Sequence, residues 1–204
     1  MEKFMEKYSV WFTTALGIFA VVFLIINWNA TPMLKKIVLF YMISLACHEW
    51  EELKLPGGFV ELVLRITGFK LKKPGSAKLA LFIITLYATI LPFLFYDKVF
   101  LVLMPVLVGI VEIIAHLLSA KVNPEKKFYS PGMITAVFIQ FPVAVFGLYY
   151  LIKIGELRVI HFLWAALLLF IPLLGGQAMI VKSNGMKYKE FINNARKTLL
   201  KKEK

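Results

Sequence analysis

The chain has 204 residues, of which 60% are hydrophobic and 18% are charged, whereas an ordinary soluble domain is about 45–50% apolar. Its mean hydropathy of +0.76 excludes a typical water-soluble globule, so lipid must cover the excess apolar surface. The formal net charge is +12, but the basic residues form short clusters between long apolar stretches. This pattern is typical of membrane topology and argues against a nucleic-acid-binding protein.

Long apolar stretches recur along the chain, and a bilayer core of about 30 Å needs about 20 apolar residues per helix. Five stretches are clear, and a sixth is uncharged only as far as Cys47, after which it carries a histidine and three glutamates. We therefore predict an all-α integral membrane protein in which residues 1–182 form one domain of six transmembrane helices. In chain order, the predicted spans are Tyr8–Lys35, Ile37–Leu53, Leu79–Tyr96, Val99–Ala120, Phe128–Ile152 and Val159–Val181.

The distribution of basic residues predicts the orientation of these spans. Six spans place both ends of the chain on the same side of the membrane. The loops and tails on that side contain 19 lysines and arginines, and the three loops on the other side contain 5. Because cytoplasmic loops carry the excess of basic residues, both termini are expected in the cytoplasm. The expected location is the cytoplasmic membrane of a prokaryote.

Two segments outside the spans have the pattern of amphipathic surface helices, namely residues 59–70 and 186–200. The second lies in a basic cytoplasmic tail, residues 183–204, where Tyr188, Phe191 and Ile192 fall on one helical face among lysines and arginines. Such helices lie in the headgroup plane, and anionic lipid attracts them by about 1 kcal/mol per nearby basic residue. We expect membrane lipids to be partners of this tail, which serves mainly as an anchor.

The chain concentrates ionisable groups in two of its spans, where each costs about 2.5–3.5 kcal/mol to insert. At about 100° per residue, His48, Glu51 and Glu52 share one face of the second predicted span, and Glu112 and His116 share a face of the fourth. Both spans run toward the cytoplasm, and their histidines lie at similar depth. Two histidines with glutamates from facing helices predict a site for one or two Zn²⁺, Fe or Mn ions, with His48, Glu52, Glu112 and His116 as ligands.

The sequence resembles a known family, the HXXEE-domain membrane proteins. The signature run is His48-Glu49-Trp50-Glu51-Glu52, His116 fits the further histidine of the family pattern, and Tyr129-Ser130-Pro131-Gly132 fits its Tyr-x-Pro-Gly element. The three matches occur in order over about 85 residues. The resemblance implies a membrane domain of unassigned function in which His48, Glu51 and Glu52 are suspected of catalysis, and it implies no substrate.

The residue types allow chemical roles to be assigned. Glu51 or Glu52 would act as general base toward a water that a metal activates, and the Tyr129 hydroxyl would orient substrate or stabilise an oxyanion. Ser44 and Gln140 are candidates for orienting the ligands by hydrogen bonds. We therefore expect a membrane enzyme that acts at the inner leaflet on a lipid or other apolar substrate, by hydrolysis rather than oxidation.

Three other interpretations remain open at this stage. The same glutamates and histidines could bind a passing metal ion or proton in a transporter or sensor, although the polar residues gather at one leaflet and no repeat is detectable. They could serve a metal-free acid/base isomerase with a buried neutral Glu112. Glu51 and Glu52 could also be solvated charges at headgroup level.

Overall fold

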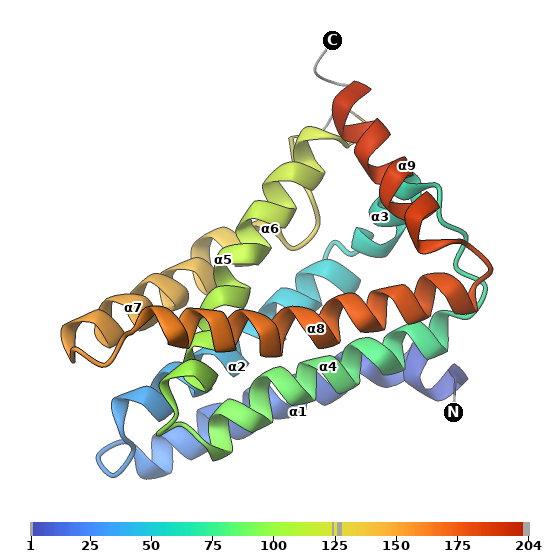
Figure 1. Cartoon of the computed structure of the whole chain (residues 1–204). Coiled ribbons are helices and arrows are strands. Elements are labelled where there is room, and N and C mark those ends of the chain that lie inside the picture. Colours follow the sequence, from blue (N-terminus) through green and yellow to red (C-terminus); the bar gives the residue numbers. More distant parts are fainter. Residues whose placement is uncertain (1, 124, 126–127, 202–204) are drawn as a thin grey trace.

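The computed structural model describes residues 2–123, 125 and 128–201, and every regular element within them is helical (Figure 1). This confirms the predicted all-α class. The elements in chain order are α1 (Glu2–Asn27), α2 (Met33–Leu53), α3 (Phe59–Thr67), α4 (Pro74–Leu94), α5 (Val99–Lys121), α6 (Met133–Thr135), the π-helix η1 (Ala136–Gln140), α7 (Phe141–Lys153), α8 (Val159–Ser183) and α9 (Tyr188–Lys201).

Five helices in the described residues are long and apolar enough to cross a membrane. They lie in α1, α4, α5, the continuous run from α6 to α7, and α8, and each overlaps a predicted span. Two boundaries differ: the span predicted as Tyr8–Lys35 ends at Asn27, and the span predicted as Phe128–Ile152 becomes helical at Met133. The remaining predicted span, Ile37–Leu53, falls in α2. That helix begins with two lysines and ends with three glutamates, so its composition does not meet the same standard, and six crossings are not confirmed.

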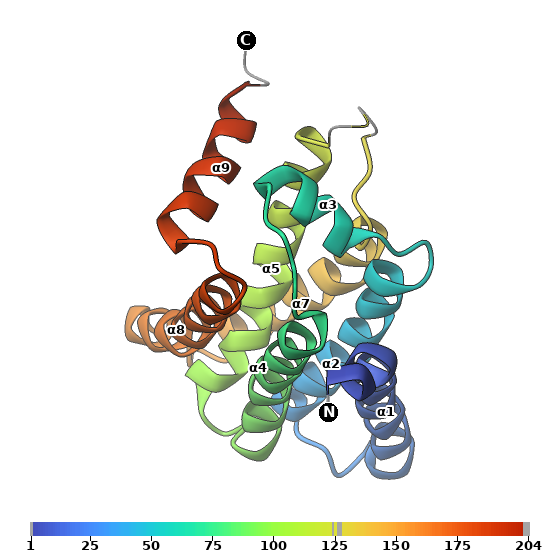
Figure 2. The same ribbon diagram turned by 90° about the vertical axis from the view of Figure 1, so that its right-hand side faces the viewer.

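The charged helix α2 packs against several neighbouring helices. It packs against α1, α4, α5 and α7, and Figure 2 shows it behind α4 and between α1 and α7. Two side-chain hydrogen bonds join it to α1: Thr13 Oγ1 donates to Glu49 Oε2 at 2.8 Å, and Trp50 Nε1 donates to Thr14 Oγ1 at 2.8 Å. Neighbouring segments therefore shield from lipid the face of α2 that carries His48 and Glu51, which are 2% and 6% exposed.

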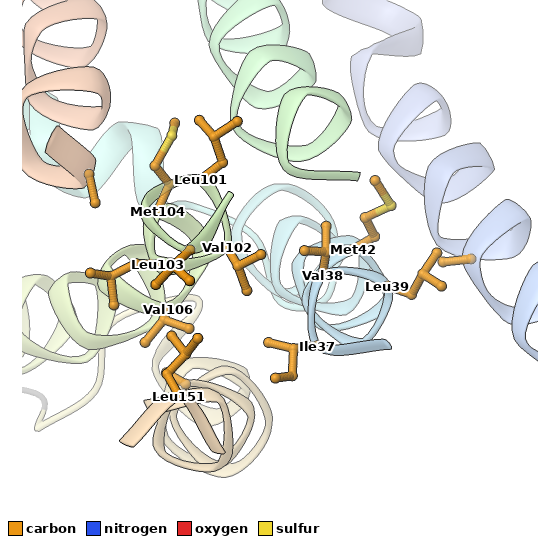
Figure 3. Close-up of a cluster of buried hydrophobic side chains, with 14 of the residues drawn as sticks. Ile37, Val38, Leu39, Met42, Leu101, Val102, Leu103, Met104, Val106 and Leu151 are labelled. Atoms are coloured by element: carbon orange, nitrogen blue, oxygen red, sulfur yellow. The ribbon is translucent and has the colours of Figure 1, made fainter. Parts of the chain in front are cut away.

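The largest buried apolar cluster occupies one half of the bundle. Its side chains come mainly from the first turns of α2 and α5 and the end of α7 (Figure 3). The short loops that join α1 to α2, α4 to α5 and α7 to α8 lie together beside this half, on the left of Figure 1. The polar residues of α2 and α5 lie in the last turns of these helices, at the other end of the bundle. The fully buried members include Ile37, Val38, Leu39, Val102, Leu103, Met104 and Leu151.

The two predicted surface helices are present as α3 and α9, but protein covers part of the tail helix. Phe191 on α9 is buried against Phe69 and Val181, with the two phenylalanine rings edge to face at 5.8 Å. Thr198 Oγ1 also donates to Ile66 O at 2.9 Å. The sequence predicted that lipid would cover this apolar face. Instead α9 packs on α3 and the end of α8, because Phe69 and Val181 offer it an apolar partner.

Replacing Phe191 with alanine should release α9 from this layer. Removal of a buried phenylalanine side chain costs about 3–5 kcal/mol, so the tail of Phe191→Ala should be cut by trypsin markedly faster than the wild-type tail. Ile192→Ala is the matched control, because Ile192 is 44% exposed. Equal cleavage rates for the two variants would contradict the packing described here.

Candidate metal centre

Two parallel helices bring the histidines of the site together. α2 and α5 both run from the short-loop end of the bundle toward the end that holds α3 (Figure 1). His48 and His116 stand near the ends of these helices, and their Nε2 atoms lie 3.3 Å apart. Their exposed fractions are 2% and 0%. The shared direction of the two spans, read from the sequence, thus accounts for their meeting.

One carboxylate from each helix completes the cluster. Glu52 Oε1 lies 3.5 Å from His48 Nε2 and 3.3 Å from His116 Nε2, and Glu112 Oε2 lies 3.8 and 3.6 Å from the same two atoms. All four atoms lie within 4.8 Å of one another, and these residues could hold a metal ion. Bonds of about 2.0–2.1 Å to a tetrahedral zinc would separate its ligand atoms by about 3.3 Å. His48, His116 and Glu52 have nearly this spacing.

Hydroxyl groups fix the orientation of both imidazole rings. His48 Nδ1 lies 3.0 Å from Thr135 Oγ1, and His116 Nδ1 lies 2.9 Å from Ser130 Oγ. Thr135 Oγ1 donates a hydrogen bond to Glu51 Oε2 at 2.6 Å, so it accepts a hydrogen bond from His48 Nδ1–H. We infer that this tautomer directs the lone pair of His48 Nε2 into the cluster. Partners of this kind hold metal-ligating histidines in orientation and raise their basicity.

Glu51 is turned from the cluster toward the segment that carries these hydroxyls. Its carboxylate accepts hydrogen bonds from Tyr129 Oη at 2.8 Å, from the backbone amides of Ile134 and Thr135 at 3.1 and 2.7 Å, and from Thr135 Oγ1. Partial burial, followed by the hydrogen bond to Glu51 and its negative charge, raises the pKa of the Tyr129 hydroxyl above its usual range. Tyr129 is therefore a stable donor, and Glu51 secures residues 129–135 against α2.

Gly132 and Phe59 cover the end of the site. Gly132 has φ +96°, and a Cβ built on it would lie 2.5 Å from His116 Cε1 and 2.7 Å from Glu52 Cγ. The Phe59 ring packs on the His116 ring with centroids 4.9 Å apart. The most accessible side chains of the cluster are the carboxylates, with exposed fractions of 16% for Glu52 and 30% for Glu112. The two carboxylates are therefore the least covered part of the cluster.

Among the described residues, the side chains of Ser44 and Gln140 make no hydrogen bond to the cluster. Ser44 Oγ donates to Tyr41 O, within its own helix. Gln140 is fully buried, but its side-chain amide has no hydrogen-bond partner among the described residues. Ser130 and Thr135 hold the imidazoles instead, and sequence reasoning missed them. Ser130 occupies the variable position of the Tyr-x-Pro-Gly element, which was the available signal, and Thr135 had none.

Comparison with known proteins agrees with this site. Residues 38–147 match the family described as proteins of unknown function with an HXXEE motif. The match covers more than half of the chain, and the chain belongs to this family. His48 and Glu52, the first and last residues of the motif, both lie in the cluster. No curated protein and no solved structure matches the chain.

Proposed function

We propose that the protein is a membrane-embedded, metal-dependent enzyme that acts on a lipid or another apolar substrate. The observation that carries this proposal is the convergence of two imidazole nitrogens and two carboxylate oxygens from α2 and α5 on one point. Such a set is costly inside a membrane protein unless it binds a cation or proton. Imidazole with carboxylate suits Zn²⁺, Fe or Mn.

The spacing of the cluster divides the roles of its members. His48, His116 and Glu52 form the tighter group and would hold the ion. Glu112 lies farther from both histidines and is the most exposed, so it can accept a proton from a water beside them. When bound, zinc lowers the pKa of a coordinated water to about 7 and polarises a carbonyl group. This arrangement favours hydrolysis, because a di-iron oxidative centre of a helical bundle usually has six ligands.

The surroundings of the cluster support the proposed substrate class. The helices around it are apolar over lengths that span a bilayer, so a substrate that partitions into lipid can reach it from the side. The cluster lies in the last turns of α2 and α5, which the sequence assigns to the side of the membrane that carries 19 of the 24 lysines and arginines. Under the positive-inside rule this end faces the inner leaflet.

The distribution of basic residues also supports α2 as a sixth transmembrane helix. α2 has 21 residues, about 30 Å of helix at 1.5 Å per residue. Neighbouring segments shield the face that carries His48 and Glu51. Both termini would then lie in the cytoplasm, as the basic loops indicate, and the membrane would be the cytoplasmic membrane. Cysteine-accessibility labelling of single cysteines placed in the 28–31 and 69–72 loops, which flank α2, would test this, since labelling from the same side would contradict it.

Elemental analysis of the detergent-purified protein tests the proposed metal site. We expect about one equivalent of zinc, iron or manganese in the wild-type protein. This metal should be lost in the His48→Ala, His116→Ala double variant. His161→Ala is the matched control, because the chain has three histidines and His161 begins α8, outside the cluster.

Two outcomes would separate the hypotheses. Metal in the wild type and in His161→Ala, but not in the double variant, supports the site and names the ion for activity assays. Equal and substoichiometric metal in all three proteins would contradict a metalloenzyme. It would leave the cluster as an acid/base or proton-binding device.

A further inference from the structure

We propose that a groove between α1 and α2 binds the single hydrocarbon chain of a lipid whose polar end is uncharged and carries a hydrogen-bond donor. This inference rests on the proposed function, because it names the substrate class and the wall of the site that selects it. Two adjoining pockets and the hydrogen bonds of their shared wall carry the argument.

The first pocket lies on the membrane-facing side of the two helices. It has a volume of about 500 Å³, within the range of about 300–1,000 Å³ for small-molecule sites. Its lining is largely apolar. Thr14, Gly17, Ile18 and Val21 come from α1, and Ile43, Ala46, Cys47 and Trp50 come from α2.

A second pocket adjoins the first. It has a volume of about 280 Å³ and again includes Cys47 and Trp50, so the two spaces share a wall. Its far end is more polar, because Glu51, Tyr129 and Thr135 line it. The apolar, lipid-facing groove therefore adjoins a pocket lined by the residues that hold His48 in orientation.

Contacts between α1 and α2 hold Trp50, which lines both pockets, in place. Trp50 Nε1 donates to Thr14 Oγ1 at 2.8 Å, and the Trp50 ring meets Trp11 edge to face at 5.3 Å. One helical turn before Trp50, α1 and α2 approach so closely that a Cβ on Gly17 would lie 2.7 Å from Ala46 Cβ. The groove is thus preformed, which lowers the entropic cost of binding a flexible chain.

The medium around the groove and the chemistry of its end identify the occupant. α1 is one of the helices apolar enough to cross a membrane, so acyl chains are the molecules that surround this face. At the polar end, the Tyr129 hydroxyl donates a hydrogen bond to Glu51, and its oxygen remains able to accept one. Because the Glu51 carboxylate is negative, a phosphate or carboxylate headgroup would be repelled, whereas a hydroxyl or amide would be accepted.

Photo-crosslinking tests this proposal on the full chain in phosphatidylcholine nanodiscs. The probe is a monoacylglycerol with a diazirine in its chain, and the comparison probe is a lysophosphatidic acid with the same chain. We expect most monoacylglycerol adducts to map to Thr14–Val21 and Ile43–Trp50, and several-fold fewer adducts there from the lysophosphatidic acid. Val21→Trp, which fills the groove, should remove these adducts. Ile25→Trp should not, because Ile25 is 75% exposed and lies outside the lining.

The outcomes distinguish this inference from the proposed function. Adducts spread over every lipid-facing helix, or concentrated on a second copy of the chain, would overturn the groove as a lipid site. Equal labelling by both probes would overturn the selection for an uncharged polar end. The metal content of Val21→Trp, measured on the same sample, should equal that of the wild type. The absence of metal from both proteins would count against the proposed function.

Discussion

Replacing Gly132 with alanine is expected to abolish metal retention and to destabilise the protein by about 2–5 kcal/mol. Two effects add at this position. The φ of +96° is a conformation that L side chains rarely adopt, which costs about 1–2 kcal/mol. The new methyl group would also overlap His116 and Glu52, and overpacking of this kind costs about 1–3 kcal/mol. Thermal unfolding in detergent and elemental analysis measure the two results.

Gly155→Ala separates these two effects. Gly155 has φ +70°, but a Cβ built there meets nothing within 4 Å. It should therefore show only the backbone cost of about 1–2 kcal/mol, with unchanged metal content. If the two variants lost the same stability and kept the same metal content, the close approach of Gly132 to the cluster would be contradicted.

Replacing Thr135 with valine is expected to weaken metal binding by about 10–100-fold. Valine keeps the shape of the side chain but removes the hydroxyl between His48 Nδ1 and Glu51 Oε2. His48 then loses the partner that fixes its tautomer, and the buried unpaired group costs about 1–3 kcal/mol of stability. Competition of the zinc-loaded protein with a chelator measures the change in affinity.

Thr89→Val is the matched control for this loss of a hydroxyl. Thr89 is fully buried in α4, and its hydroxyl bonds only to Thr85 O and Leu86 O of its own helix. Zinc affinity should be the same as in the wild-type protein. An unchanged affinity in Thr135→Val as well would show that the hydroxyl does not orient His48.

Helix periodicity and topology were sufficient to predict which ionisable residues would meet. His48, Glu52, Glu112 and His116 lie at i, i+4 spacings on helices that run in the same direction, so local geometry and depth suffice to bring them together. Periodicity also grouped Glu51 with His48, but the structure turns Glu51 toward residues 129–135. A helical wheel shows which residues share a face and cannot show which partner each one finds there.

The predictions that differ from the structure depended on long-range packing. Residues 129–135 approach α2 through a chain of hydrogen bonds from Tyr129, Ile134 and Thr135 to one carboxylate. No local pattern encodes such contacts, so Thr135 was not foreseen. The tail helix was assigned to lipid for the same reason. Its amphipathic face is visible in the sequence, but the partner of Phe191 is determined by the path of α8 and the loop after α3.

The π-helix η1 sets the phase between two helical faces. Its last hydrogen bond runs from the Phe141 amide to Ala136 O, five residues back, so the turn holds one residue more than an α-helical turn. Each residue of an α-helix advances the chain by about 100°. Deleting one residue between 136 and 140 would therefore rotate Thr135 by about 100° relative to α7 and away from His48. The number of residues in this turn, and not only the motif before it, determines whether a lipid-facing helix can present a hydroxyl to the histidine.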